Sequence, residues 1–278
     1  MFSDFLLTSD YDRTLTDPAG NVPQRNIDAI RYFIDNGGAF TVNTGRSLPF
    51  SASLLQTIPM NAPFIAYNGG LTIDGDRIIS QQTIDLPLEK TLRAVCDAFP
   101  DLNVDLHGVK AHFGFQPTGS WEEFYAAQNT EYHLAAPGVD YGPFIKFNVY
   151  GPLKNVSFYG PFSGTPEETA RIDEAAAWLE RTYGDKITIF RAAARILNIH
   201  APNVSKLRAA RDLQKMLGRK YLICVGDAKN DLPMLEGADF SFCPADGVVA
   251  DRFPNVCSCA DGAVADVIYN KIPEILKG

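Results

Sequence analysis

Short apolar runs alternate with a helical pattern in the first third of the chain. Phe5 to Ser9 and Ala39 to Asn43 are apolar runs of strand length, and isoleucines recur at helical spacing from about Pro23 to Asn36 between them. Phe64 to Tyr67 is a third apolar run, and Leu71 to Ser80 has the pattern of a hairpin that turns at an Asp-Gly-Asp sequence. This alternation of strands and helix predicts a parallel sheet.

A different pattern occupies the middle of the chain, from about Gln82 to Ala194, which is rich in aromatic residues, turns and short alternating strands. One helix is predicted over about Leu86 to Ala98. Another begins at Thr165, where a proline and a glutamate are placed for a capping box. Between the helices, Val104 to Phe115 and Phe144 to Tyr159 have strand patterns, so this segment is expected to be a separate α+β module.

The α/β pattern returns at Ile196 and continues to the end of the sequence. It comprises a helix over about Val204 to Leu217, a strongly apolar strand at Tyr221 to Val225, and a short helix after Asp231. The α/β pattern is therefore split in sequence by the middle module.

Together these patterns predict an α/β fold with a Rossmann-like parallel-sheet core of residues 1–82 and 196–278, and an inserted α+β cap domain of residues 83–195. A chain of 278 residues is long enough for two compact domains. Hydrophobic residues make up 46% and charged residues 21%, which is typical of globular proteins and too apolar for a disordered chain.

Charge, apolar run length and cysteine content argue against nucleic-acid binding, a membrane span and a structural zinc site. The formal net charge is −8 and there is no Lys/Arg-rich run, so no nucleic acid is expected. Apolar stretches are too short for a membrane span and the first residues lack the features of a signal peptide, so we expect a cytoplasmic monomer or homodimer. The five cysteines are expected to be reduced thiols, and no second Cys or His pair near Cys257 and Cys259 completes a structural zinc site.

Two acidic pairs follow predicted strands. Asp10 and Asp12 come directly after the first strand, and Asp227 and Asp231 follow the strand Tyr221 to Val225. Either pair alone is also typical of a polar turn or a helix cap. Because the carboxyl ends of parallel strands meet at one edge of a sheet, the four carboxylates are expected to lie together, where they repel one another unless a cation is bound. Oxygen ligands without His or Cys favour Mg²⁺.

Two further residues suit phosphoryl chemistry. Thr44, in a Thr-Gly-Arg turn after the second strand, offers a hydroxyl and backbone amides to a phosphate oxygen. Lys206, in the first turn of a predicted helix, offers a fixed positive charge. Such turns are common after strands, however, and a lysine at the start of a helix usually faces solvent.

The order of these clusters, Asp-x-Asp, Thr-Gly-Arg, Lys and Gly-Asp-x-x-Asn-Asp, resembles that of the haloacid dehalogenase-like phosphatases. The likeness is to the Cof-type, sugar-phosphatase-like subgroup, in which a cap is inserted between the second and third motifs. It extends to Asn68-Gly69-Gly70, to Arg195–Ile199 ahead of the lysine, and to Asp261–Ala265 before the last helix. The resemblance therefore covers both ends of the chain, whereas the middle segment is recognisable by position more than by motif.

The resemblance implies a catalytic role for four residues. Asp10 would be the nucleophile that forms an aspartyl-phosphate, and Asp12 would protonate the leaving oxygen and then activate water. Thr44 would hold a phosphate oxygen. Lys206 would neutralise charge on Asp10 and on the phosphoryl group.

Metal and substrate contacts are implied in the same way. Asp227 would bind Mg²⁺ together with Asp10 and the backbone carbonyl of Asp12. Asp231 would support the metal or its waters, and Asn230 would brace the loop. The expected substrate contacts are residues of the turns next to these motifs: Arg13, Gly45, Arg46 and Asn68.

Two positions depart from the family pattern. Arg13 stands where the family usually has Gly after the second aspartate, so the turn either loses conformational freedom or gains a charge that reaches the substrate. Leu207 follows the lysine at a position where small residues are common. Neither change removes a reacting group.

The implied activity is Mg²⁺-dependent hydrolysis of a small phosphorylated metabolite, with sugar phosphates as the leading class. Specificity is expected from polar or aromatic residues of the cap, among which the candidates are His112, Trp121, Tyr132, His133, Lys146 and Arg191. The alternatives are a phosphotransferase or phosphomutase, a catalytically silent metabolite-binding protein, and dehalogenase or phosphonate chemistry. Retention of Asp10 argues against a silent protein, and the magnesium-binding pair argues against dehalogenation.

Overall fold

A computed structural model of the protein describes residues 1–117, 119–127, 130–136, 138–152 and 164–277. The chain forms two compact units. The first unit consists of Met1–Gly45, Leu54–Ser80 and Ser205–Gly278, and the second consists of Arg46–Ser53 and Gln81–Val204. Each unit is thus assembled from segments that are distant in sequence.

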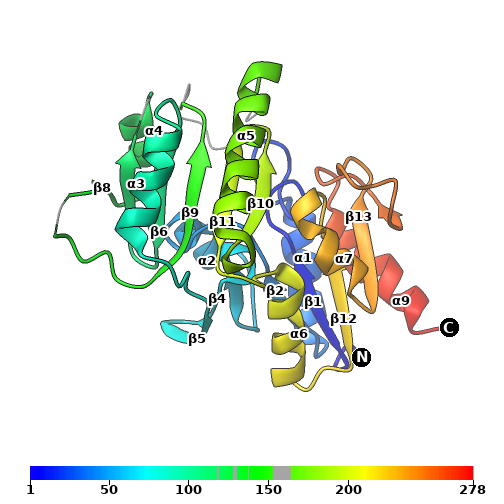
Figure 1. Ribbon diagram of the computed structural model, residues 1–278. Coiled ribbons are helices and arrows are strands. Elements are labelled where there is room, and N and C mark those ends of the chain that lie inside the picture. Colours follow the sequence, from blue (N-terminus) through cyan, green and yellow to red (C-terminus); the bar gives the residue numbers. More distant parts are fainter. Residues whose placement is uncertain (118, 128–129, 137, 153–163, 278) are drawn as a thin grey trace. The chain divides into compact units, whose positions relative to one another are not determined.

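A five-stranded parallel sheet is the centre of the first unit. Its strands, in spatial order, are β14 (Asn255–Val256), β13 (Phe240–Pro244), β12 (Tyr221–Val225), β1 (Phe5–Ser9) and β2 (Ala39–Val42) (Figure 1). β1 pairs in parallel with both β12 and β2, and it is buried along its whole length. Continuous apolar runs are what strands buried on both faces require. The predicted parallel sheet is confirmed.

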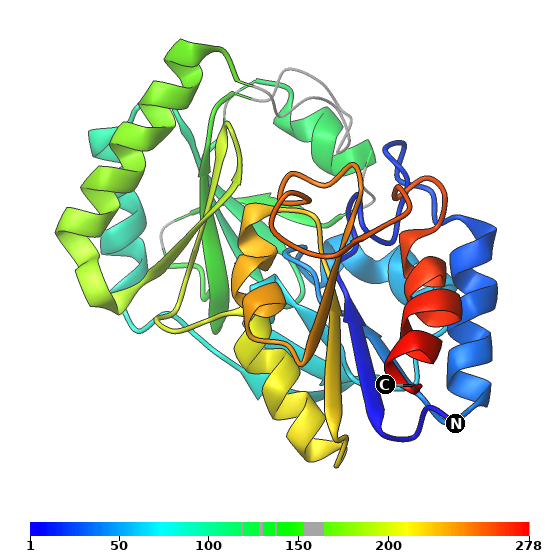
Figure 2. The ribbon, with the colours of Figure 1, turned by 90° about the vertical axis from the view of Figure 1, so that its right-hand side faces the viewer.

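Helices cover both faces of this sheet. α1 (Gln24–Asp35) and α8 (Ala263–Asp266) contact each other on one face, and α6 (Lys206–Met216) packs beside α7 (Leu232–Glu236) on the other (Figure 2). After α8 the chain continues through a π-helical turn (Val267–Lys271) into α9 (Ile272–Ile275). α1 is the helix predicted between the first two strands, and it buries Ile27, Ile30 and Phe33.

A three-stranded sheet follows β2. β3 (Phe64–Ala66) is linked to the end of β2 by a parallel bridge between Asn43 and Ile65, and it pairs antiparallel with β4 (Leu71–Asp74). β5 (Arg77–Gln81) completes the predicted hairpin, whose turn contains Gly75 at a φ of 58°. The remaining short elements here are η1 (Pro49–Ser51), α2 (Ala52–Thr57) and η2 (Tyr67–Gly69).

The second unit is built on a six-stranded sheet. Its strands, in spatial order, are β10 (Thr188–Ala193), β11 (Ile196–His200), β9 (Phe144–Tyr150), β6 (Asn103–Gly108), β7 (His112–Gln116) and β8 (Tyr132–Leu134). Neighbouring strands are antiparallel except β7 and β8. Its helices are α3 (Leu88–Ala98), α4 (Trp121–Ala127) and α5 (Pro166–Tyr183), and the turn η3 (Gly184–Lys186) follows α5. This α+β architecture is the one expected for the middle of the chain.

Two predicted strands and one predicted boundary differ in detail from the structure. The pattern from Val104 to Phe115 forms the two strands β6 and β7. The strand expected from Phe144 to Tyr159 ends at Tyr150, and residues 153–159 lie outside the described part of the chain. β11 belongs to the six-stranded sheet, although the α/β pattern was expected to return at Ile196. It pairs antiparallel with β9 through all five residues, so the α/β pattern resumes at α6.

Helix α5 begins as its sequence predicts. The Thr165 side chain accepts a hydrogen bond from the Glu168 backbone N–H at 3.2 Å, and the Glu168 carboxylate accepts one from the Thr165 N–H at 2.9 Å. This reciprocal capping box satisfies two backbone donors that a helix start otherwise leaves unpaired. None of the described helices combines the length and the apolar composition that a membrane crossing needs.

Candidate active site

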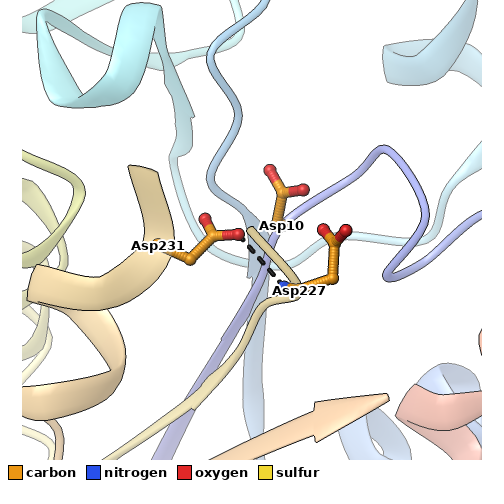
Figure 3. A group of neighbouring side chains, drawn as sticks. All are labelled: Asp10, Asp227 and Asp231. Carbon is orange, nitrogen blue, oxygen red and sulfur yellow. Dashed lines mark hydrogen bonds between the residues drawn. The ribbon is translucent and has the colours of Figure 1, made fainter. Parts of the chain in front are cut away.

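Acidic side chains meet at the carboxyl edge of the parallel sheet. Asp10 follows β1, and its backbone N–H donates to Val225 O at the end of β12 (2.9 Å), two residues before Asp227. Asp231 is the last residue of the turn η4 (Lys229–Asp231), and its carboxylate lies beside those of Asp10 and Asp227. Carboxylate oxygens of Asp10, Asp227 and Asp231 lie within 4.8 Å of one another, and all three side chains are buried (Figure 3).

Lys206 connects two of these carboxylates. Its Nζ donates to Asp10 Oδ1 and to Asp231 Oδ1, the latter at 2.6 Å, and its side chain is fully buried. Lys206 is the first residue of α6, whose N-cap Ser205 accepts a hydrogen bond from the Arg208 N–H at 3.1 Å. Burial alone would lower the pKa of Lys206, but the two carboxylates outweigh it and the pKa is raised. Lys206 is therefore a fixed positive charge.

Burial, together with neighbouring negative charges, raises the pKa of two of the carboxyl groups. Burial raises the pKa of Asp10 well above its usual value; Lys206 opposes this shift, and the charges of Asp231, Asp227 and Asp12 add to it. Burial, followed by the charge of Asp231, raises the pKa of Asp227 to about 7. Asp10 and Asp227 therefore hold a proton more readily than isolated carboxyl groups do, although one ammonium group lies beside them.

The loop after β12 holds Asp231 in place. Its Oδ2 accepts hydrogen bonds from the backbone N–H groups of Asp227 (3.1 Å, the dashed line in Figure 3) and Ala228 (3.0 Å), while its Oδ1 accepts from Lys206. Both oxygens of Asp231 are therefore engaged. Asp10 and Asp227 are the better placed of the three to bind a cation directly, with Asp231 as support.

These residues fit a divalent cation that prefers oxygen ligands. Hard carboxylate oxygens in a crowded, buried group are the donor set that Mg²⁺ takes, and a bound cation would offset the repulsion that raises the pKa values. In the part of the chain that the structure describes, this is the one group of three His, Cys, Asp or Glu side chains spaced to hold a metal.

Two buried residues support this group, and neither was singled out from the sequence. Thr14 Oγ1 donates to Asp227 Oδ1 at 3.0 Å, and Asn43 Nδ2 donates to the backbone oxygen of Lys206 at 3.0 Å. Thr14 holds one carboxylate, and Asn43 ties the end of β2 to the start of α6. The only signal in the sequence was their position beside the motif residues Asp12 and Thr44.

The turn after β2 is connected to Asn68 and Asn230. The backbone N–H of the fully buried Thr44 donates to Ile65 O, and its O accepts from Asn68 N, both at 2.9 Å. A Cβ on Gly45 would lie 2.8 Å from Asn68 Oδ1, so a larger residue there would have to displace the Asn68 side chain. Asn68 Oδ1 in turn accepts a hydrogen bond from Asn230 Nδ2 at 3.3 Å. These four predicted residues thus form one connected group.

The other predicted contacts are placed differently. Asp12 is half-buried and contributes to the raised pKa of Asp10. Arg13 is exposed with a φ of 58°, in the left-handed region that favours the glycine usual at this position. Arg46 belongs to the second unit, where its Nη1 donates to Phe50 O at 3.5 Å.

Leu207, the second departure from the family pattern, has a structural explanation. A Cβ at Gly237, the residue that ends α7, would lie 2.3 Å from Leu207 Cδ2. Leu207 thus occupies space that a larger residue at position 237 would take, and it packs against the apolar core of the first unit. A bulky residue after Lys206 is accommodated because its neighbour is glycine.

The six candidates from the middle segment fall into two groups. Arg191 forms an ion pair with Asp173 (2.8 Å), His133 Nε2 lies 2.7 Å from Glu131 Oε1, and the rings of Trp121 and Tyr132 contact each other. His112 and Lys146 are instead buried on the six-stranded sheet. Only the latter two are thus drawn into a buried polar group.

Comparison with known proteins establishes the family. Residues 7–250 match the family model of the haloacid dehalogenase-like hydrolases. The match spans most of the chain, and the protein therefore belongs to this family of enzymes. None of the curated protein sequences compared with the chain matches it.

Solved structures share the whole fold. A haloacid dehalogenase-like hydrolase from Bacteroides thetaiotaomicron superposes with a TM-score of 0.76 at 16% identity, covering 95% of this chain and 97% of the other. One from B. subtilis has a TM-score of 0.76 at 18% identity, covering 95% and 99%. A sugar phosphatase of subclass IIB has a TM-score of 0.77 at 17% identity, covering 98% of each chain. The expected parallel-sheet core with an additional α+β part is thus the fold of this family.

Proposed function

We propose that this protein is a Mg²⁺-dependent phosphomonoester hydrolase of small phosphorylated metabolites, acting through an aspartyl-phosphate on Asp10. The observation that carries the proposal is the contact of the buried Lys206 ammonium with both Asp10 and Asp231, beside Asp227. A carboxylate next to a fixed cation and a metal-ligand pair is the arrangement that phosphoryl transfer needs.

In the proposed mechanism Asp10 and Asp12 divide the chemistry. A carboxylate oxygen of Asp10 attacks phosphorus while the bond to the leaving oxygen breaks, and Asp12 gives that oxygen a proton. Asp12 then takes a proton from water, whose oxygen attacks the phosphorus and releases phosphate from Asp10. Lys206 holds its positive charge throughout, because its pKa is raised by the carboxylates around it.

The metal ligands would be Asp10, Asp227 and the backbone carbonyl of Asp12, with Asp231 in support. When bound, Mg²⁺ would neutralise these carboxylates and the charge of the phosphoryl group. Thr44 would hold a phosphate oxygen, and Asn230 would brace Asn68. Gly45, Asn68, Arg46 and Arg13 would contact the substrate.

We assign sugar phosphates as the substrate class and the second unit as the cap. The support is the resemblance of the fold to the subclass IIB sugar phosphatase, together with an α+β unit inserted between the Thr44 turn and Lys206. The limits expected from the sequence, 83–195 for the cap and 1–82 with 196–278 for the core, differ from those of the two units, because the second unit consists of Arg46–Ser53 and Gln81–Val204.

The test is phosphate release from a panel of sugar phosphates, with Mg²⁺ or with a chelator. Wild type, Asp10→Asn and the matched control Asp76→Asn, an exposed aspartate in the β4–β5 turn, are compared. We expect Mg²⁺-dependent release that is lost in Asp10→Asn and retained in Asp76→Asn, since an amide cannot form the acyl-phosphate.

Two other results would change the proposal. Turnover by Asp10→Asn, with contaminating phosphatase excluded, would remove Asp10 from the nucleophile position. Phosphate transfer to an added acceptor hydroxyl, with no release in water, would favour the phosphotransferase or phosphomutase alternative. Absence of both would favour a silent metabolite-binding protein.

A further inference from the structure

Asn43 lies between the end of β2 and the Thr44 turn, and it is fully buried. Its backbone N–H donates to Ser9 O at 2.8 Å, directly before Asp10. It also forms the parallel bridge to Ile65 of β3. Backbone pairing on both sides therefore fixes the position of Asn43 beside the acidic group.

The side-chain amide of Asn43 reaches the first residue of α6. Its Nδ2 donates to the backbone oxygen of Lys206 at 3.0 Å and lies 3.6 Å from Met234 Sδ on α7. A carbonyl oxygen in the first turn of a helix already accepts a bond from the N–H four residues later, and its second lone pair is free for the amide. The bond joins residues 163 positions apart, and it connects β2 to the residue that carries the ammonium group.

Asn43 is a costly residue for this place. Its Oδ1 is buried and has no hydrogen-bond partner among the described residues. Its neighbours Ile65 and Met234 belong to the apolar core of the first unit, where an aliphatic side chain would need no hydrogen bond. A buried amide with one unsatisfied end contributes less to stability than such a side chain would. A polar residue that lowers stability and contacts a motif residue is typical of a functional position.

The ammonium group of Lys206 depends on where its backbone lies. Its Nζ donates to Asp10 and to Asp231 at once, from the end of a flexible four-carbon stem that is fully buried. A shift of the Lys206 backbone would therefore lengthen at least one of the two contacts. A displacement of about 1 Å in a catalytic group is enough to lower a rate by roughly 100-fold.

The residue before Lys206 is held from other directions. Ser205 Oγ accepts from the Arg208 N–H at 3.1 Å, and the backbone of Gly69 approaches Ser205 O closely. These contacts fix the cap of α6. The Asn43 amide adds the contact to Lys206 itself.

We propose that Asn43 is a positioning residue that fixes the Lys206 ammonium group between Asp10 and Asp231. It acts on the reaction through the backbone of Lys206 and not by contact with the substrate. The effect on the Lys206 contacts is a property of the fold, whereas the consequence for catalysis rests on the proposed function. Because Asn43 directly precedes Thr44, one residue sets both the fixed cation and the turn that would hold a phosphate oxygen.

The first arm of the test measures stability and needs no turnover. Urea unfolding, followed by far-UV circular dichroism, is compared for wild type, Asn43→Leu, Lys206→Met and the double variant. Lys206→Met leaves buried carboxylates without their cation, so it should lower the urea midpoint of wild type by roughly 1–2 M. In the Asn43→Leu background the same substitution should lower the midpoint by about half as much, because the ammonium group is already displaced.

The single variants separate positioning from structural support. Asn43→Leu loses a hydrogen bond but also removes an unsatisfied oxygen, so its urea midpoint should stay within roughly 0.5 M of wild type. The matched control is Asn61→Leu at the other end of β2, where the amide accepts from the Phe40 N–H (2.8 Å) and donates to Gly38 O (2.9 Å). Both ends of that amide are satisfied, so Asn61→Leu should lose more stability than Asn43→Leu.

The second arm measures phosphate release from the best sugar phosphate. Asn43→Leu should lower kcat roughly 10- to 100-fold and change KM less than about 3-fold, because a misplaced cation stabilises the transition state less well. Asn61→Leu should keep the wild-type kcat. Asn43→Ala should lose kcat in the same way, which separates loss of the amide from the shape of leucine.

Each outcome decides a different point. Equal falls in midpoint on Lys206→Met in both backgrounds would overturn the positioning role, whatever the turnover. Unequal falls without phosphate release from any compound would support the positioning of Lys206 and count against the proposed function. Unequal falls with a wild-type kcat in Asn43→Leu would overturn the catalytic part of the proposal. If Asn43→Leu does not fold, Asn43→Ala takes its place in the comparison.

Discussion

At the first residue of α6, one ammonium group contacts two carboxylates. A cation in the first turn of a helix faces the positive end of the helix dipole, which costs roughly 0.3–1 kcal/mol, and burial adds a desolvation cost. Lys206 stands there nevertheless, bonded to Asp10 and Asp231. A position that is unfavourable for the helix but matched to two acidic partners is typical of a functional residue.

The hydrogen bond from Thr14 to Asp227 predicts an effect on metal activation. Thr14→Val keeps the shape of the side chain but removes the donor, so Asp227 becomes a less well positioned ligand. Given roughly 1.5–3 kcal/mol for a hydrogen bond to a charged group, the Mg²⁺ concentration at half-maximal phosphate release should rise about 10-fold or more. A Mg²⁺ titration of the phosphatase activity measures this change.

Thr8→Val on β1 is the matched control. Thr8 is also fully buried, and its Oγ1 has no hydrogen-bond partner among the described residues. Loss of that hydroxyl should leave the Mg²⁺ requirement unchanged and the free energy of unfolding equal to or above that of wild type. Equal Mg²⁺ titrations for Thr14→Val and wild type would show that Thr14 has no part in positioning Asp227.

Residues next to a motif were harder to predict than the motif itself. Asp10 and Asp227 could be predicted to meet because each follows a strongly apolar strand, and parallel strands end at one edge. The bond from Thr14 to Asp227 joins residues 213 positions apart, so no local pattern indicates it. The positive φ of Arg13 could not be predicted either, because the sequence showed only that Arg13 replaces the glycine usual in the family.

At the scale of elements, the hydrophobic pattern predicts the sheet position of β1 but not that of β11. β1 is a continuous apolar run, which fits only the interior of a parallel sheet. In β11, Leu197 and Ile199 alternate with Asn198 and His200, which predicts a strand with one apolar face but not the sheet to which it belongs. Antiparallel pairing with β9 places β11 in the six-stranded sheet. Because this pairing joins residues that are far apart in sequence, the local pattern of β11 does not indicate it.

The contact between η2 and the start of α6 leads to a prediction for Gly69→Ala. Gly69 has a φ of 95°, and a Cβ there would lie 2.3 Å from the backbone oxygen of Ser205, next to Lys206. We expect the left-handed backbone to cost about 1–2 kcal/mol and the overlap a further 1–3 kcal/mol of unfolding free energy. Urea unfolding followed by far-UV circular dichroism measures the sum.

Gly75→Ala separates the two contributions. Gly75 also has a positive φ, 58°, but a Cβ there would meet nothing within 4 Å. Only the backbone cost is expected, so Gly75→Ala should lose less stability than Gly69→Ala. If the two variants lose equal amounts of unfolding free energy, the backbone at Gly69 does not approach Ser205 as closely as the structure indicates.

At the scale of the whole molecule, each unit contains its own buried charged group. In the first unit this is Lys206 with its carboxylates, and in the second it is Asp105 with Lys146. Both tryptophans of the chain, Trp121 and Trp178, lie in the second unit. Tryptophan fluorescence therefore reports on the unfolding of the second unit alone, which makes its charged group accessible to measurement.

The pKa of Lys146 predicts how the stability of the second unit depends on pH. Burial lowers this pKa from 10.5 to about 8, with Asp105 opposing the shift. The unfolded chain therefore keeps the Lys146 proton to a higher pH than the folded chain, and between about pH 8 and pH 10.5 the lysine contribution to stability rises with pH. Below pH 8 the folded unit holds a buried charge at a cost that Lys146→Met avoids.

Relative to wild type, Lys146→Met should therefore have its largest advantage in unfolding free energy at pH 7, and that advantage should shrink by about 2 kcal/mol by pH 9.5. The measurement is urea unfolding by tryptophan fluorescence at both pH values. Lys110→Met, at an exposed site in the turn between β6 and β7, is the baseline for losing a lysine charge as such. A stability difference that is the same at pH 7 and pH 9.5 would mean that Lys146 keeps its proton in the folded unit over this whole range.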